Sequence, residues 1–199
     1  MKYKFIILCL IFFISCKSEV KNKIPKKHNP HEQINQNLEN EKAIELYFKG
    51  TENLTNGNFK LAQSYLKESF EIEKSPITLN ELGTISLAEN KYKEALSYFN
   101  ESITLDKTYY PSHINKSRVF VIELDFEKAE VTLKNMIKEC KSKYWTAYAN
   151  FYLTTIYINN RENCEKIKKH LNKSQILKED TSLTQLYLSI EKTVKKRCG

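Results

Sequence analysis

The chain has 199 residues and a formal net charge of +8, with 28% charged and 41% hydrophobic residues. This is the length of one domain, long enough to bury a shared core. With only four glycines and no strand-like alternation of apolar and polar residues, the sequence predicts an all-α protein and excludes a glycine-rich phosphate loop.

The first residues, MKYKFIILCLIFFISC, place two lysines before an apolar run of about ten residues, which is the length of a signal-peptide core and too short for a membrane span. The run ends in Phe13, Ile14, Ser15 and Cys16, which resemble the lipobox of a bacterial lipoprotein, although Leu is more usual than Phe13. We therefore expect residues 1–15 to be removed as a lipoprotein signal peptide and Cys16 to carry lipid. The alternatives are an uncleaved anchor helix and a conventionally cleaved signal.

Residues 16–40 are predicted to form a flexible tether after the lipidated cysteine. The segment is rich in Lys, Asn, Gln and Glu and has few apolar side chains to bury. His28 and His31 are close enough in sequence to share a metal ion, but no third ligand is nearby. We predict no metal site and no cofactor.

Residues 41–199 carry a repeated pattern of large and small residues. In the stretch from Pro76 to Lys107, large residues fill positions 4, 7, 17 and 24 and small residues fill positions 8 and 20: Leu79, Leu82, Tyr92, Phe99, Gly83 and Ala95. The same residue types recur from Ala43 and from Tyr110, with a spacing of 33 to 34 residues. The pattern resembles the tetratricopeptide repeat family over roughly residues 43–178.

The resemblance implies an α-α superhelix of about four helical hairpins with a capping helix at the C-terminal end. We expect hairpins at 41–55 with 59–73, 76–89 with 92–106, and 110–123 with 126–140. The fourth repeat fits two frames, one with Trp145 at position 4 and one with Phe151 there. In either frame it is longer than its neighbours, which indicates an extended first helix. The apolar stripe from Leu183 to Val194 then predicts the capping helix.

In this family the first helices of the hairpins form a concave groove that binds peptides. The family positions that meet a ligand place these candidate binding residues in the groove: Tyr47, Thr51, Asn80, Thr84, Ile114 and Arg118. Arg118 is a cation on a largely apolar face, and an ion pair with a neighbouring glutamate is the alternative role for it. Some of the apolar residues could instead pack against the tether or neighbouring helices. The residues that would clamp the carboxylate of a chaperone tail are absent.

Cys140, Cys164 and Cys198 remain once the signal is removed and Cys16 is lipidated, in a compartment that permits disulfides. Cys164 begins the second helix of the fourth repeat and Cys198 ends the capping helix. If these helices pack antiparallel, the two residues meet, so we predict a disulfide between them and a free thiol at Cys140. The alternative is that both thiols stay unpaired.

No motif of an enzyme is present, and the four histidines offer no catalytic spacing. One of them, His170, lies among lysines and is expected on the surface. We expect no enzyme and no nucleic-acid binding, because the aromatic residues occupy packing positions of the repeat. The basic surplus lies in residues 161–199, with ten basic and five acidic side chains, against 14 and 15 in residues 43–160. A solvated helix face explains it as readily as contact with anionic lipid or an acidic partner.

These observations together predict a lipid-anchored, exported protein-interaction scaffold, expected at the outer membrane facing the periplasm. It resembles small repeat lipoproteins that assist outer-membrane protein or pilus assembly in Gram-negative bacteria. The rival interpretation is an adaptor that recruits a peptidoglycan-processing enzyme, and the minor one is an uncharacterised enzyme. The sequence leaves the oligomeric state open.

Overall fold

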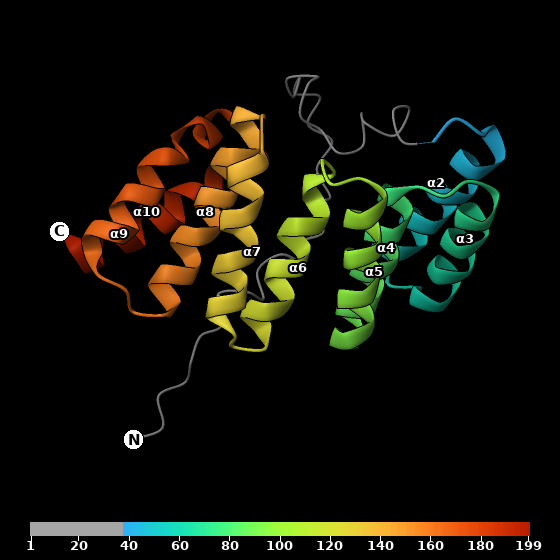
Figure 1. Ribbon diagram of the computed structural model, residues 1–199, viewed down its shortest axis with the longest axis horizontal. Helices are drawn as coiled ribbons and strands as arrows, with labels where there is room; N and C mark the ends of the chain where they lie inside the picture. The colour runs from blue at the N-terminus through green and yellow to red at the C-terminus, as the bar shows by residue number, and fades with distance from the viewer. Residues whose placement is uncertain (1–37) are drawn as a thin grey trace.

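The computed structural model describes residues 38–199, which form nine α-helices, one 3₁₀ helix and no strands (Figure 1). The helices are α2 (Glu41–Thr55), α3 (Phe59–Ile72), α4 (Pro76–Ala88), α5 (Tyr92–Leu105), α6 (Tyr110–Ile122), α7 (Phe126–Glu139), α8 (Lys143–Asn159), α9 (Cys164–Lys173) and α10 (Thr184–Cys198), with the 3₁₀ helix η3 (Gln175–Glu179) between the last two. The all-α prediction is confirmed, and the expected helix ends are correct to within a residue. Cys16, His28 and His31 lie outside the described residues.

The helices pair into hairpins that stack in chain order, from α2 and α3 at one end to α9 and α10 at the other (Figure 1). The second helix of each of the first three hairpins packs on the first helix of the next one, as α3 does on α4, α5 on α6 and α7 on α8. The first helices α2, α4, α6 and α8 also contact one another in succession. They therefore share one face of the stack, as the predicted superhelix requires.

Small residues at the eighth repeat position let the two helices of a hairpin approach closely. A Cβ atom at Gly50 would lie 2.5 Å from Leu66 Cγ, and one at Gly83 would lie 2.5 Å from Phe99 Cε1. Real Cβ atoms do not come this close, so Leu66 and Phe99 fill the space that glycine leaves. The size pattern in the sequence is thus explained by contacts within each hairpin.

In each of the first two hairpins, a serine hydroxyl forms a hydrogen bond between the two helices. Ser69 Oγ donates to the carbonyl of Ala43, and Ser102 Oγ donates to the carbonyl of Pro76, both at 2.8 Å. Each bond joins the end of a second helix to the start of the first helix of the same repeat. The bonds satisfy polar groups in the packed interior, where an unpaired group would be costly.

The fourth repeat has the extended first helix that the sequence predicts. Helix α8 has 17 residues, whereas the earlier first helices have 13 to 15. It begins at Lys143, one residue after the start that the frame with Trp145 at position 4 gives, and its partner α9 begins at Cys164.

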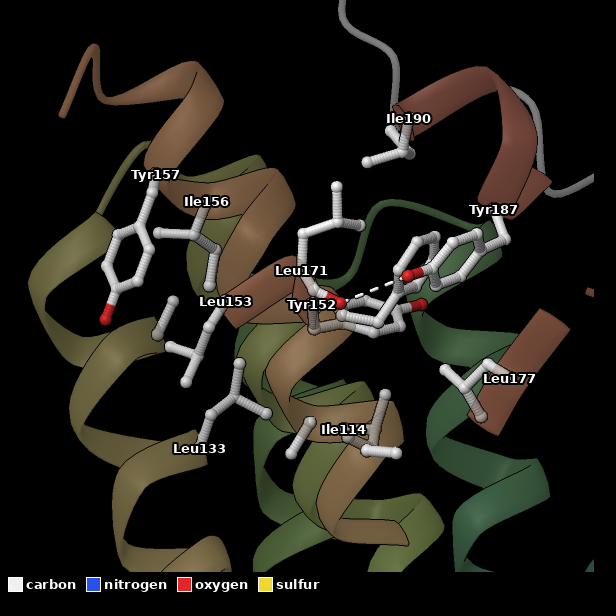
Figure 2. Close-up of a cluster of buried hydrophobic side chains, with 14 of the residues drawn as sticks. Ile114, Leu133, Tyr152, Leu153, Ile156, Tyr157, Leu171, Leu177, Tyr187 and Ile190 are labelled. Atoms are coloured by element: carbon white, nitrogen blue, oxygen red, sulfur yellow. Dashed lines mark hydrogen bonds between the residues drawn. The ribbon is translucent and has the colours of Figure 1, made fainter. Parts of the chain in front are cut away.

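Helix α10 packs at the C-terminal end of the stack, beside α9 (Figure 1). Tyr187 on α10 donates its hydroxyl to the carbonyl of Leu171 on α9 at 3.1 Å (Figure 2). Its ring stacks on Phe151 of α8 at a centroid distance of 5.5 Å. Ile190 and Val194 are buried beside it, while Lys192, Lys195 and Lys196 are exposed. The capping helix is therefore present with its apolar stripe inward.

One residue in this region differs from the expectation. The sequence places His170 on the surface among lysines, but it is partly buried, with Nδ1 2.8 Å from Asn150 Oδ1 and its ring against Tyr157. Burial, together with the charges of Lys173 and Lys169, lowers the pKa of His170 to about 4. The ring packs because α9 turns this face towards the longer α8.

The packed part of the chain begins slightly before α2. Leu38 is only 1% exposed although it precedes the helix, and the Asn40 side chain caps α2 by accepting from the backbone amides of Lys42 and Ala43. The Glu73 carboxylate accepts from the amides of Glu39 and Asn40, at 2.7 to 3.0 Å. These bonds join the chain before α2 to the end of α3.

No helix within residues 38–199 has both the length and the apolar character needed to cross a membrane.

Candidate functional site

A cavity of about 350 Å³ opens on the face formed by the first helices. Every first helix contributes to its lining, and one further residue, Tyr109, comes from the turn before α6. The lining residues are Tyr47, Thr51, Leu54 and Thr55 of α2, Ile77, Asn80 and Glu81 of α4, Tyr109, Pro111, Ile114, Asn115 and Arg118 at α6, and Trp145, Tyr148 and Tyr152 of α8. We call this set the groove.

Aromatic rings line the α8 end of the groove. The ring of Tyr148 lies 5.5 Å from that of Trp145, in an edge contact, and 5.5 Å from that of Tyr152, in a stacked one. Tyr47 and Tyr109 contribute two more rings on the α2 side. Tyr148 is partly exposed and the other four rings are at most 9% exposed, so the rings form a rigid wall of the cavity with Tyr148 as its most accessible part.

A row of hydrogen-bonded polar side chains joins α4 to α6 along the groove. Asn80 Nδ2 donates to Glu81 Oε1 at 3.1 Å, while Asn80 Oδ1 accepts from Asn115 Nδ2 at 2.9 Å. Asn115 Oδ1 in turn accepts from Arg118 Nη1 at 3.0 Å. Because each amide donates on one side and accepts on the other, the row fixes the position of the two charged side chains at its ends.

The environment of Glu81 disfavours its charge. Burial raises the pKa of the Glu81 carboxyl to about 7, against the opposing effect of the hydrogen bond from Asn80. Burial, and after it the Glu81 carboxylate, also raises the pKa of the Tyr47 and Tyr109 phenols. The three side chains therefore lie close enough for electrostatic interaction.

Five of the six predicted binding residues lie in the groove: Tyr47, Thr51, Asn80, Ile114 and Arg118. Thr84 does not line it, and its hydroxyl donates to the Asn80 carbonyl of its own helix at 2.9 Å. Tyr47, Ile114 and Asn80 are only 1%, 3% and 5% exposed. These three side chains therefore belong to the packed structure as well as to the groove wall.

Sequence reasoning missed several lining residues. Glu81 and Asn115 each come directly after a residue that the family pattern places in the groove. Including the next residue after each groove position would therefore have identified them. Trp145, at the fourth position of its repeat, is expected in the interior of the fourth hairpin, yet it lines the cavity together with Tyr148 and Tyr152. The opposite side of α8 instead packs on α9, where Asn150 contacts His170. No pattern in the sequence indicates this orientation of the helix.

The predicted disulfide is present at the far end of the stack, away from the groove. Cys164 and Cys198 are bonded, with their Cα atoms 5.4 Å apart, and Cys140 is a free, partly buried thiol. Arg197, beside Cys198, donates to the carbonyls of Ile158 and Glu162 at 2.6 and 3.1 Å. The end of α10 is thus held both covalently and by hydrogen bonds.

No model of a known protein family matches the sequence, and no curated protein matches it. Solved structures match its fold. A tetratricopeptide repeat protein from Parabacteroides merdae superposes with a TM-score of 0.58 and 18% identity, over 79% of this chain and 62% of that one. The chain has the tetratricopeptide repeat fold.

Two other solved tetratricopeptide repeat structures with this fold are described with a peptide-binding site or a bound peptide. YrrB, a tetratricopeptide repeat protein with an unusual peptide-binding site, matches with a TM-score of 0.56 and 17% identity, over 75% of this chain and 74% of that one. The first such domain of Spaghetti (RPAP3), bound to the HSP90 peptide SRMEEVD, matches with a TM-score of 0.52 and 16% identity, over 63% of this chain and 98% of that one. Identities this low establish a common fold, while the ligands remain those of the other proteins. The chain also spans less than two thirds of the Parabacteroides protein.

Proposed function

We propose that this protein is an interaction scaffold that binds an extended peptide segment of a partner protein in the groove. The observation that carries the proposal is a single cavity lined by four consecutive first helices, with aromatic rings at both ends and a polar row between them. A concave, largely apolar surface with a few fixed polar groups is the usual form of a ligand site. Two structures of the same fold, Spaghetti with a bound HSP90 peptide and YrrB with a peptide-binding site, support the choice of ligand class.

The mode of binding differs from that of a carboxylate clamp. In such a clamp these positions hold lysine and asparagine in one repeat and lysine and arginine in a later one, and here they carry Tyr47, Thr51, Pro111 and Asn115. The kind of peptide that this groove binds is therefore inferred from its own side chains and not from the HSP90 peptide of the Spaghetti complex.

Selection from a library of displayed random 12-residue peptides tests the groove. The purified domain should enrich a common set of peptides, and Thr51→Arg should abolish their capture because the new side chain fills the cavity. Thr104→Arg is the matched control, since Thr104 is an exposed threonine on the second helix α5 that likewise donates its hydroxyl to a carbonyl of its own helix. Equal capture by the two variants would place binding elsewhere and contradict the proposal.

We further propose that the scaffold is exported and held at the outer membrane by lipid on Cys16, facing the periplasm. The short apolar run before Cys16 and the polar segment after it support this, and two or more acyl chains anchor stably where one is marginal. Cys16→Ser should leave the precursor unprocessed or move the protein out of the membrane fraction. Unchanged processing and membrane fractionation of this variant would contradict lipid anchoring at Cys16. That result would leave the proposal of peptide binding in the groove untouched.

The partner is then expected among the proteins of the cell envelope. Affinity capture from membranes with wild-type protein and with Thr51→Arg identifies proteins that depend on the groove. Groove-dependent recovery of a β-barrel would support a role in outer-membrane assembly. Recovery of a peptidoglycan hydrolase would favour the recruiting adaptor instead.

A further inference from the structure

The groove contains a carboxylate that no basic side chain of residues 38–199 neutralises. Glu81 is partly buried, and the donor that contacts it is the neutral amide of Asn80. Two other partly buried glutamates have lysine partners: Glu130 pairs with Lys134 at 2.6 Å, and Glu191 pairs with Lys178 at 2.8 Å. A carboxylate removed from water is normally paired with a cation, and within residues 38–199 Glu81 has none.

The side chains around Glu81 favour a cation over another kind of ligand. Tyr47 and Tyr109 line the same cavity and lie close enough to Glu81 for its charge to affect their phenols. Aromatic rings beside a carboxylate attract an ammonium or guanidinium group through both the ring faces and the negative charge.

The overall charge of the protein does not produce this preference. The chain has a formal net charge of +8, which attracts acidic ligands at long range. Residues 43–160, which form the groove, are nearly balanced, with 14 basic and 15 acidic side chains. A preference for a cationic ligand would therefore have to arise from a local contact, and Glu81 is the acidic residue that lines the cavity.

We propose that the groove recognises its peptide through a lysine or arginine whose charged group contacts the Glu81 carboxylate in the part of the groove that Tyr47 and Tyr109 line. This inference rests on the proposed peptide-binding function and specifies the residue that the groove selects. The row from Asn80 to Asn115 and Arg118 holds the carboxylate in place, so Glu81 is available to the ligand in a fixed position.

The test uses the same library of displayed 12-residue peptides with wild-type protein, Glu81→Gln and Glu101→Gln. Glutamine keeps the size of Glu81 and can still accept from Asn80. Glu101 is an exposed glutamate on the outer helix α5, so Glu101→Gln removes the same charge away from the groove. Wild type and Glu101→Gln should enrich lysine or arginine at one peptide position, and Glu81→Gln should lose that enrichment.

The best wild-type peptide is then synthesised with its selected lysine or arginine and with norleucine there, which keeps an apolar stem and removes the charge. In wild type, norleucine should weaken the Kd by about tenfold or more, as for loss of a hydrogen bond to a charged group. In Glu81→Gln the same change should have an effect of less than about threefold, because the two groups act as a pair.

The outcomes separate this inference from the function on which it rests. If wild type retains no peptide, both are wrong. If peptides are retained in the groove without a cationic preference, or norleucine weakens binding equally in wild type and Glu81→Gln, the role of Glu81 is wrong while peptide binding stands. A preference for acidic residues would likewise overturn the cationic assignment.

Discussion

At the scale of single residues, several groove side chains also hold the stack together. Tyr47 and Ile114 are 1% and 3% exposed, so truncating either to alanine would remove part of the core at a cost of roughly 2–5 kcal/mol. Lost binding in such variants could not be distinguished from lost folding. Thr51, Glu81 and Arg118 are partly exposed and are the better sites for testing function.

Glu81 is expected to cost stability when it is charged. Its pKa of about 7 in the folded chain lies above the ordinary value of 4.5, so between these pH values the folded chain binds more protons than the unfolded chain. The free energy of unfolding therefore falls as the pH rises from 4.5 to 7. Glu81→Gln should stabilise the protein at pH 8 by on the order of 1–2 kcal/mol, after allowance for partial solvent exposure.

Urea unfolding of wild type and Glu81→Gln at pH 4 and pH 8 measures this difference. The stabilisation should be present at pH 8 and absent at pH 4, where Glu81 is protonated in both states. Equal stability of the two proteins at pH 8 would show that the carboxylate is well solvated. A stabilising substitution that abolishes selectivity would mark Glu81 as a residue kept for binding.

At the scale of elements, each hairpin turns through one residue with positive φ. Gly57, Asn90, Leu124 and Arg161 have φ values of 78°, 60°, 61° and 56°. The first three occupy the same repeat position, two residues after the first helix ends. Glycine and asparagine tolerate this conformation, whereas a leucine is strained in it. Among these three turns, the one between α6 and α7 therefore has the least favourable residue at the position with positive φ.

Leu124→Gly should relieve this strain at little cost in packing, because Leu124 is 68% exposed. The expected gain is about 0.5–1 kcal/mol, since the greater freedom of glycine in the unfolded chain offsets part of it. Thermal or urea unfolding measures the change. Leu188→Gly is the control: Leu188 is 45% exposed within α10, where glycine should destabilise by about 1 kcal/mol. Destabilisation by both substitutions would mean that Leu124 is not strained.

At the scale of the whole molecule, the stack has a separate core region at each end. One buried cluster joins α6 to α10, another lies mainly within the first two hairpins, and a smaller one lies between them. Because each hairpin contacts only its neighbours, a change at one end should be felt mostly at that end. The disulfide and Arg197 hold the C-terminal end, where α10 has no further hairpin to cover it.

Replacing both Cys164 and Cys198 with serine should loosen that end selectively. The bond closes a loop with a sequence separation of 34 residues, which is worth about 3–4 kcal/mol in the chain-entropy model. Hydrogen exchange should become faster in α9 and α10 and stay unchanged in α2 to α5. Cys140→Ser, which removes the free thiol, should leave exchange at both ends as it is. Uniform loss of protection along the chain would show that the stack unfolds as one unit.

Much of this architecture could be predicted from the sequence. Glycine at positions 50 and 83, with a large residue 16 positions after each, requires two closely packed helices, and the repeat of this pattern requires the stack. The apolar stripe of α10 predicts a cap, and antiparallel packing of α9 and α10 predicts the disulfide. These features follow from size and periodicity within neighbouring segments, which a linear sequence records directly.

The groove chemistry depended on contacts between repeats, which only the tertiary structure decided. Asn80 lies within hydrogen-bond distance of Asn115 because α4 and α6 pack side by side, although 35 residues separate them. The orientation of α8 followed from its packing on α9, and it brought Trp145 and its neighbours into the groove. Whether a carboxylate meets a cation depends on distance in space, and within residues 38–199 Glu81 meets none. The spacing of residues along the sequence does not give distances between repeats.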